Sequence, residues 1–200
     1  YWSFSARTYV HNAVQNVKQL LALDERGLKA TAKTPFPSAT YRPELDTTEE
    51  LDAEMASRYA QLIGVLRWAV ELGRLDIYHE VAILSQYLAL PRVGHLEVVY
   101  HVFAYLQAHE KSRIIFDPHD PLCQDMVGYQ KFPEVDWSDF YEDASAEMPP
   151  KMPEALGRPV CTYAFVDANH AGNVVTCRSH TGILIFVQNA PIIWHSRRQN

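Results

Sequence analysis

Asp167 is the residue whose place in the sequence most clearly suggests chemistry. It follows an apolar segment and precedes the turn-forming residues Asn169 and Gly172. A carboxylate at the end of an apolar strand is costly to bury unless it pairs with a cation or binds a metal ion. An aspartate that only starts a turn is the commoner arrangement. The spacing leaves both interpretations open, and a strand would place Tyr163, Phe165 and Asp167 on one face.

Arg197 and Arg198 form a second candidate site, because two guanidinium groups directly follow the apolar residues 192–194. Arginine side chains commonly contact phosphate oxygens, so this pair could position a nucleic-acid backbone. The alternative is a solvated strand end. The two charges by themselves do not separate these interpretations.

The nine histidines and three cysteines do not form a metal-binding pattern. His95, His101 and His109 fall on one predicted helix at spacings of six and eight residues, so they do not share a face as an i, i+4 pair would. The cysteines have no CxxC spacing, which argues against a zinc ribbon and against a disulfide framework. We therefore expect structural histidines and an intracellular, reducing compartment.

Apolar residues in the first part of the chain recur at helical spacing. They predict four helices, over residues 10–21, 54–70, 77–88 and 94–109, the third of which Pro91 ends. A short strand is predicted over residues 114–116. The last 41 residues favour strands over residues 160–166, 182–187 and 190–196, with turns at Asn173 and at Gln188-Asn189. The pattern predicts an α+β protein.

Charge is unevenly distributed along the chain. The net charge of −6 argues against nucleic-acid binding. Residues 117–159, however, hold 3 basic and 10 acidic residues together with seven of the twelve prolines, which is typical of a linker. Residues 160–200 hold 3 basic residues and one acid.

No apolar run approaches the roughly 18 residues that a membrane span needs, so we expect no membrane partner.

Several motifs, taken in order, resemble one family. They lie at residues 59–68, Gly73 to Ile77, Leu84 to Leu88, 166–172, 178–182 and 193–199. This series is similar to the region of copia-type LTR retrotransposon polyproteins that runs from the reverse transcriptase into the RNase H domain. The family's Arg-Pro-Asp-Ile corresponds to Arg74, Leu75, Asp76 and Ile77 in this chain.

The resemblance implies three regions. Residues 1–116 would be the helical thumb and connection region of the reverse transcriptase, and residues 117–159 an acidic, proline-rich linker. Residues 160–200 would be the first β-hairpins of an incomplete RNase H-like domain. Tyr1 in place of Met also indicates an internal piece of a longer polyprotein.

The resemblance also implies site residues. Asp167 matches the first of four RNase H acids, a catalytic ligand of Mg²⁺, and the expected partner is an RNA–DNA hybrid or template–primer. Arg178, Ser179, Arg197 and Arg198 are expected to contact nucleic acid. Where the family usually has Asp-Ala-Asp, this chain has Asp167, Ala168 and Asn169. Either the second aspartate of that motif is not a metal ligand, or this copy of the element is decayed.

By this resemblance, the parent polyprotein is expected to copy element RNA into DNA and to degrade the RNA of the hybrid, in a cytoplasmic particle or the nucleus. This piece alone is expected to be inactive, because Asp167 is the one carboxylate within residues 160–200. The other acids of both active sites would lie in the remainder of the polyprotein. Two alternatives remain, a non-catalytic nucleic-acid-binding remnant and a host protein that uses the fold for protein contacts.

Overall fold

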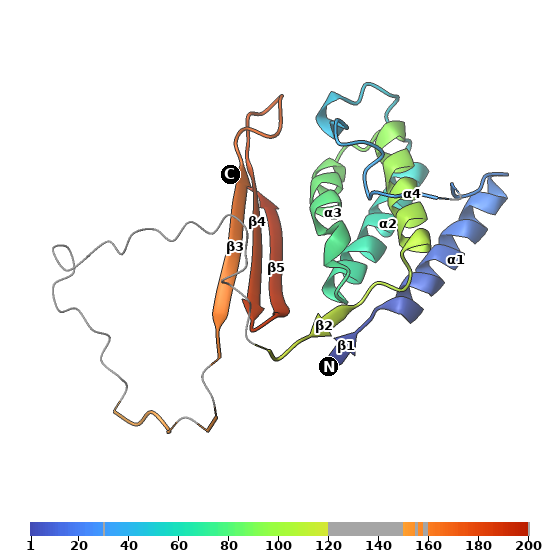
Figure 1. Ribbon diagram of the computed structural model, residues 1–200. Helices are drawn as coiled ribbons and strands as arrows, with labels where there is room; N and C mark the ends of the chain where they lie inside the picture. The colour runs from blue at the N-terminus through green and yellow to red at the C-terminus, as the bar shows by residue number, and fades with distance from the viewer. Residues whose placement is uncertain (30, 120–149, 155, 158–159, 200) are drawn as a thin grey trace.

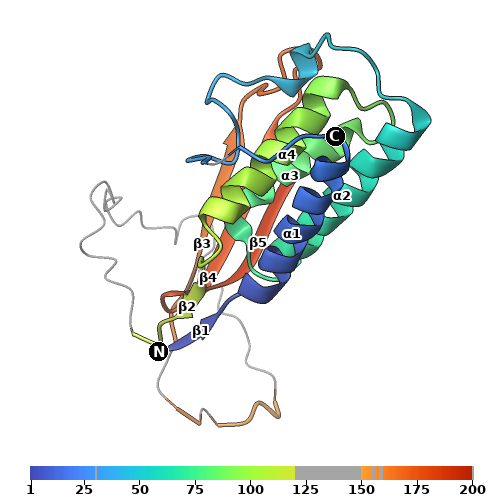
Figure 2. The same ribbon diagram turned by 90° about the vertical axis from the view of Figure 1, so that its right-hand side faces the viewer.

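A helical layer covers one face of a small antiparallel sheet in the computed structural model (Figures 1 and 2). The structure describes residues 1–29, 31–119, 150–154, 156–157 and 160–199. Most of the predicted linker, at 117–159, lies outside these residues. The mixture of helices and antiparallel strands confirms the α+β class. The four helices are α1 (Arg7–Leu23), α2 (Ala53–Glu71), α3 (Tyr78–Leu84) and α4 (Val93–Ala108).

The helical layer has a continuous apolar core, as the helical spacing predicts. Val10, Leu66 and Phe103 are buried on α1, α2 and α4, and they belong to one cluster. Asp52 defines the start of α2, since its carboxylate accepts the Met55 N–H at 2.8 Å. Three of the four predicted helices are therefore confirmed, with ends that differ by a few residues.

The third predicted helix is shorter than its apolar spacing indicates. The segment divides into a 3-10 turn at Leu75–Ile77, the α-helix α3 and a second 3-10 turn at Ser85–Tyr87. The Ser85 hydroxyl donates to the Val81 carbonyl at 2.6 Å, where the helix changes its winding. Ile77, Val81 and Leu84 are still buried, so the apolar face is correct although the α-helix is not continuous.

The corner between α2 and α3 is held by an ion pair whose arginine is buried. Arg74 is 2% exposed, and its Nε and Nη2 donate to the two carboxylate oxygens of Asp76 at 2.9 and 2.8 Å. Gly73 turns the chain with a φ of 92°, which a side chain rarely adopts. The Asp76 carboxylate also accepts the Tyr105 hydroxyl of α4 at 3.1 Å. The corner is therefore tied to the last helix.

A two-stranded ribbon joins the two ends of the helical layer. β1 (Trp2–Phe4) pairs antiparallel with β2 (Ile114–Phe116), which confirms the predicted short strand. Sequence spacing gives no sign of β1, because three residues are too few to show alternation. Its partner lies more than 100 residues away in the sequence.

The last three strands form an antiparallel meander in the order β3-β4-β5. They are β3 (Thr162–Asn169), β4 (His180–Val187) and β5 (Ala190–Arg198), so the three predicted strands and both turns are confirmed. A register shift between Ile185 and Phe186 marks a bulge. Tyr163 and Phe186 stack across β3 and β4 with their ring centroids 5.0 Å apart.

The sheet packs on the helical layer through β5 and α3. Trp194 is packed against the helical core, and the His195 ring meets the Tyr78 ring edge-on at 6.4 Å. Figure 2 shows the helices in front of the sheet, and Figure 1 shows α3 next to β5. Within the described part of the chain, no helix is long and apolar enough to cross a membrane.

Candidate nucleic-acid interface

Two cavities lie next to each other where the sheet meets the helical layer. The first has a volume of about 500 Å³ and the second about 380 Å³. Gln86 and Arg198 line both of them, and the Arg198 Nη1 donates to the Gln86 Oε1 at 3.1 Å. This hydrogen bond separates the two cavities. We call the pair of cavities the junction groove.

Cations surround the junction groove. Arg42 and Arg178 line the first cavity, and Arg67 and Arg197 line the second, with Arg198 between them. Three acids, Glu44, Glu71 and Glu80, also line the groove. Arginine is well suited to bind phosphate because its planar guanidinium offers several donors in a fixed geometry. The groove is thus a basic surface on a chain whose net charge is −6.

All four residues predicted to contact nucleic acid line this groove. Arg178 and Ser179 come from the loop between β3 and β4 and lie in the first cavity. Arg197 lies in the second cavity, and Arg198 borders both. The structure therefore brings together two motifs that are about 20 residues apart in the sequence.

The β3–β4 loop is fixed at several points, which positions Arg178. The Asn173 carboxamide oxygen accepts the N–H groups of Val175 and Thr176 at 3.1 and 2.8 Å. The Ser179 hydroxyl accepts the Ala171 N–H at 3.1 Å. Glu44, from the loop before α2, accepts the Val174 N–H at 3.1 Å. This last contact joins the helical layer to the sheet next to the first cavity.

Asn169 has a structural role in the turn after β3. Its carboxamide oxygen accepts the His180 backbone N–H at 2.6 Å. A Cβ added at Gly172 would lie 2.0 Å from the Asn169 Nδ2, so a side chain there would displace the Asn169 carboxamide. A carboxylate at position 169 could accept the same hydrogen bond. The substitution of Asn for the family's Asp is therefore compatible with this turn.

Asp167 lies on β3 close to the groove but does not line it. It is exposed, and it pairs in register with Gly182, which in turn pairs with Ser196. Because side chains two positions apart share a face, Asp167 is on the same sheet face as Asn169, which lines the first cavity. Among the residues that the structure describes, no cluster of three His, Cys, Asp or Glu side chains could hold a metal ion.

His180 is the most perturbed histidine at the junction. It is 9% exposed, meets the His79 ring of α3 edge-on at 5.2 Å and forms a 2.8 Å hydrogen bond with the Ser196 hydroxyl. Burial, together with the nearby His79, Arg198 and His195, lowers the pKa of His180 to about 4. The imidazole is therefore neutral where the sheet packs on α3.

We expect acid to destabilise the protein through His180. The folded state disfavours its protonation, so between about pH 6.5 and pH 4 the unfolded state binds more protons. The free energy of unfolding should fall over this range by up to about 3 kcal/mol. Urea unfolding at several pH values, followed by circular dichroism, would measure it. His180→Gln should remove this part of the pH dependence, and the exposed His170→Gln should leave it. Equal pH dependence in the wild type and in His180→Gln would contradict the assignment.

The predicted histidines of α4 are structural, as expected. His95 is buried, its Nδ1 accepts the Arg92 N–H at 3.2 Å, and its Nε2 donates to the Pro43 carbonyl at 3.0 Å. The His101 Nε2 donates to the Thr34 carbonyl at 3.0 Å. Both side chains hold the loop that precedes α2, and that loop forms one wall of the first cavity.

Comparison with known proteins points to one class. The chain is similar to part of a retrotransposon Pol polyprotein, which supports a retroelement origin. The relative is the retrovirus-related Pol polyprotein from transposon TNT 1-94 of Nicotiana tabacum. It is 24% identical over 154 residues, which cover 76% of this chain and 9% of that polyprotein. No family model matches the sequence. No solved structure matches it.

Proposed function

We propose that this chain is the part of a retrotransposon polyprotein that joins the reverse transcriptase to its RNase H domain and helps to grip an RNA–DNA hybrid. The observation that carries the proposal is the junction groove. Arg178, Arg197 and Arg198, expected from the sequence to contact nucleic acid, line one groove between the predicted thumb region and the predicted RNase H strands. Its arginines would contact the phosphate backbone.

The position of Asp167 supports the same proposal. A strand of nucleic acid along the groove would run on the sheet face that also carries this carboxylate. The chain's own residues do not fit Mg²⁺, which prefers six oxygen ligands in near-ideal geometry. Asp167 is the one carboxylate of the last 41 residues, and the Asn169 oxygen is occupied by the His180 N–H. The remaining ligands would come from the rest of the polyprotein.

The proposal predicts that the groove arginines control binding to a hybrid. Arg178→Gln, Arg197→Gln and Arg198→Gln should each weaken the binding of a labelled RNA–DNA hybrid by about five-fold. Each should also reduce the slope of log K against log salt by about 1. Fluorescence anisotropy at several salt concentrations would measure both quantities. Arg113→Gln, on the exposed loop between α4 and β2, is the matched control. Groove variants that bind as well as this control would refute the assignment.

A protein-interaction role is the second candidate, and the second face of the sheet is the observation that favours it. Val166 is 68% exposed, and the neighbouring apolar side chains Ile183, Ile185 and Ile193 share its face. Apolar faces of this kind often mark contacts with another protein. A chain that serves only this role would show no salt-dependent binding to the hybrid.

A further inference from the structure

Three side chains of different chemical character line the first cavity of the junction groove along α3 and the turn that follows it. Glu80 and Ile83 line it from α3, at positions i and i+3 of the helix, and Tyr87 lines it from the 3-10 turn that follows. Tyr87 is held by the His95 ring, whose centroid is 4.2 Å from its own. The cavity floor thus runs from an acid, over an aliphatic side chain, to an aromatic ring.

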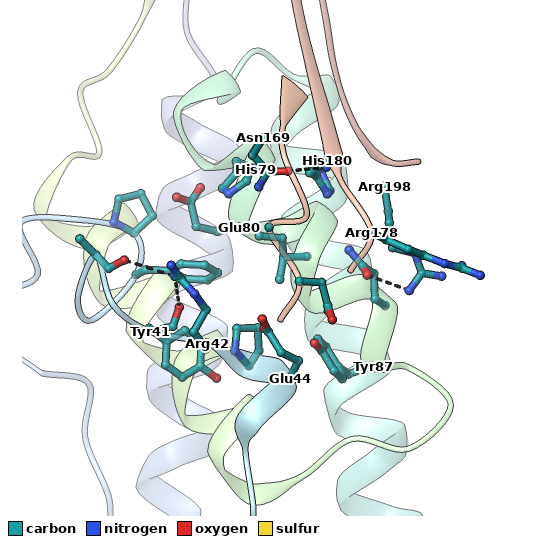
Figure 3. Close-up of a pocket in the computed structure, with 18 of the residues that line it drawn as sticks. Tyr41, Arg42, Glu44, His79, Glu80, Tyr87, Asn169, Arg178, His180 and Arg198 are labelled. Carbon is teal, nitrogen blue, oxygen red and sulfur yellow. Dashed lines mark hydrogen bonds between the residues drawn. The ribbon is translucent and has the colours of Figure 1, made fainter. Parts of the chain in front are cut away.

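Two arginines lie near the Tyr87 end of this cavity floor, where Glu44 is a further charged neighbour of Tyr87. Arg198 is bonded to Gln86 at the Tyr87 end, and Arg178 reaches the cavity from the β3–β4 loop. Figure 3 shows Arg178 and Arg198 together on one side of the cavity and Glu80 away from them. Glu80 and Gln86 are six positions apart, which corresponds to about 9 to 10 Å along α3 and the 3-10 turn.

Glu80 is a partly buried acid whose charged neighbour is another acid. Burial raises its pKa, and the nearby Asp76 raises it further. No ion pair involves its carboxylate among the residues that the structure describes. A carboxylate in this setting gains most from a neutral hydrogen-bond donor, because a donor satisfies its oxygens without requiring a second buried charge.

We propose that this cavity takes one unpaired nucleotide of a bound strand, and that it selects a base with an exocyclic amino group. The phosphate lies at Arg178 and Arg198, the sugar lies beside Tyr87, and the base packs on Ile83. The amino group, such as N4 of cytosine, donates to Glu80. The cavity of about 500 Å³ is within the usual size range of small-ligand sites. The inference rests on the proposed function, since it names the part of a bound nucleic acid that enters this cavity.

The experiment compares three hybrids that differ in one nucleotide. They are a blunt RNA–DNA hybrid, the same hybrid with a single dC overhang and the same hybrid with a single dU overhang, with the overhang placed at each strand end in turn. Cytosine and uracil have nearly the same shape, but uracil offers an acceptor where cytosine offers a donor. The dC overhang at one end should raise the affinity about ten-fold over the blunt hybrid, and dU should not.

Variants then assign the effect to the cavity. Glu80→Gln keeps the size of the side chain and should bring dC and dU overhangs to within about two-fold of each other, when each affinity is expressed relative to the blunt hybrid in the same variant. Glu49→Gln, on an exposed glutamate outside the cavity, is the control and should keep the preference for dC. Thermal unfolding of each variant checks the fold.

The outcomes separate this inference from the proposed function. Equal affinity for all three hybrids overturns the inference and leaves the proposed binding of the hybrid backbone in place. A preference for dC that persists in Glu80→Leu also overturns it, because leucine offers no acceptor to the amino group. If the blunt hybrid binds weakly and the dC overhang clearly raises the affinity, the proposed binding of the hybrid backbone is wrong and the nucleotide site is supported. No binding of any of the three overturns both.

Discussion

Replacement of Asp76 by alanine should lower the free energy of unfolding by about 3 kcal/mol, because it leaves a buried guanidinium without its carboxylate. Arg74 is 2% exposed, whereas the Asp76 side chain is 30% exposed, so the cost falls mainly on the arginine. The Arg74 Nη1 is already buried without a hydrogen-bond partner in the described structure. The substitution also removes the acceptor of the Tyr105 hydroxyl. Urea unfolding followed by circular dichroism would measure the loss.

The matched control is the exposed pair of Arg26 and Glu97, whose side chains are 47% and 46% exposed. Glu97→Ala should cost less than about 1 kcal/mol, because solvent screens an exposed pair. The double substitution Arg74→Met and Asp76→Ala should recover part of the stability lost in Asp76→Ala, since it removes the buried charge altogether. A loss in Asp76→Ala no greater than in Glu97→Ala would show that the corner does not depend on this ion pair.

The Arg74 pair also shows what sequence reasoning missed. The motif from Arg74 to Ile77 is visible in the sequence as a family resemblance, but its physical role is not. An arginine next to an aspartate is usually a solvated pair on a surface. Burial of Arg74 depends on how α2, α3 and α4 pack, and this packing is a tertiary property that local spacing does not contain.

Most of the secondary structure was predictable because its signals are local. Helical spacing of apolar residues identifies α1, α2 and α4, and the turn residues at Asn173 and Gln188 separate the strands of the sheet. The division of the third helix was not predictable, because its apolar face continues through the 3-10 turns. β1 was missed because its pairing with β2 is a long-range contact.

The candidate site was predictable in part for the same reason. Arg178, Ser179, Arg197 and Arg198 belong to short motifs that stand out in the sequence. Arg42 and Glu80 join them in the junction groove from a loop and a helix without any motif at that position, and Arg67 joins them from the motif at residues 59–68, where it had no predicted role. A residue that contributes only through the docking of the sheet on α3 leaves no signal in its sequence neighbours.

The largest effect on function is expected from Asp167 in the complete polyprotein. There, Asp167→Asn should reduce Mg²⁺-dependent cleavage of the RNA in an RNA–DNA hybrid by more than about 100-fold, since even outer-shell partners of metal ligands cost roughly 10- to 100-fold. Asparagine keeps the size of the side chain and removes its charge. Stability should change little, because Asp167 is exposed and faces Gly182 across the strand pair. The present chain alone should show no cleavage, because a single carboxylate does not hold Mg²⁺ against water.

Asn169→Asp tests whether the family's second aspartate is a metal ligand. Either side chain can accept the His180 N–H, so the turn should form in both proteins, and the added acid should change cleavage less than Asp167→Asn does. Hybrid cleavage by the parent polyprotein and both variants, with folding checked by circular dichroism, would test this. If Asp167→Asn cleaves as fast as its parent, Asp167 is not a metal ligand and the turn interpretation is correct. If Asn169→Asp alone is active, the second acid is a ligand after all, and this copy of the element has lost it.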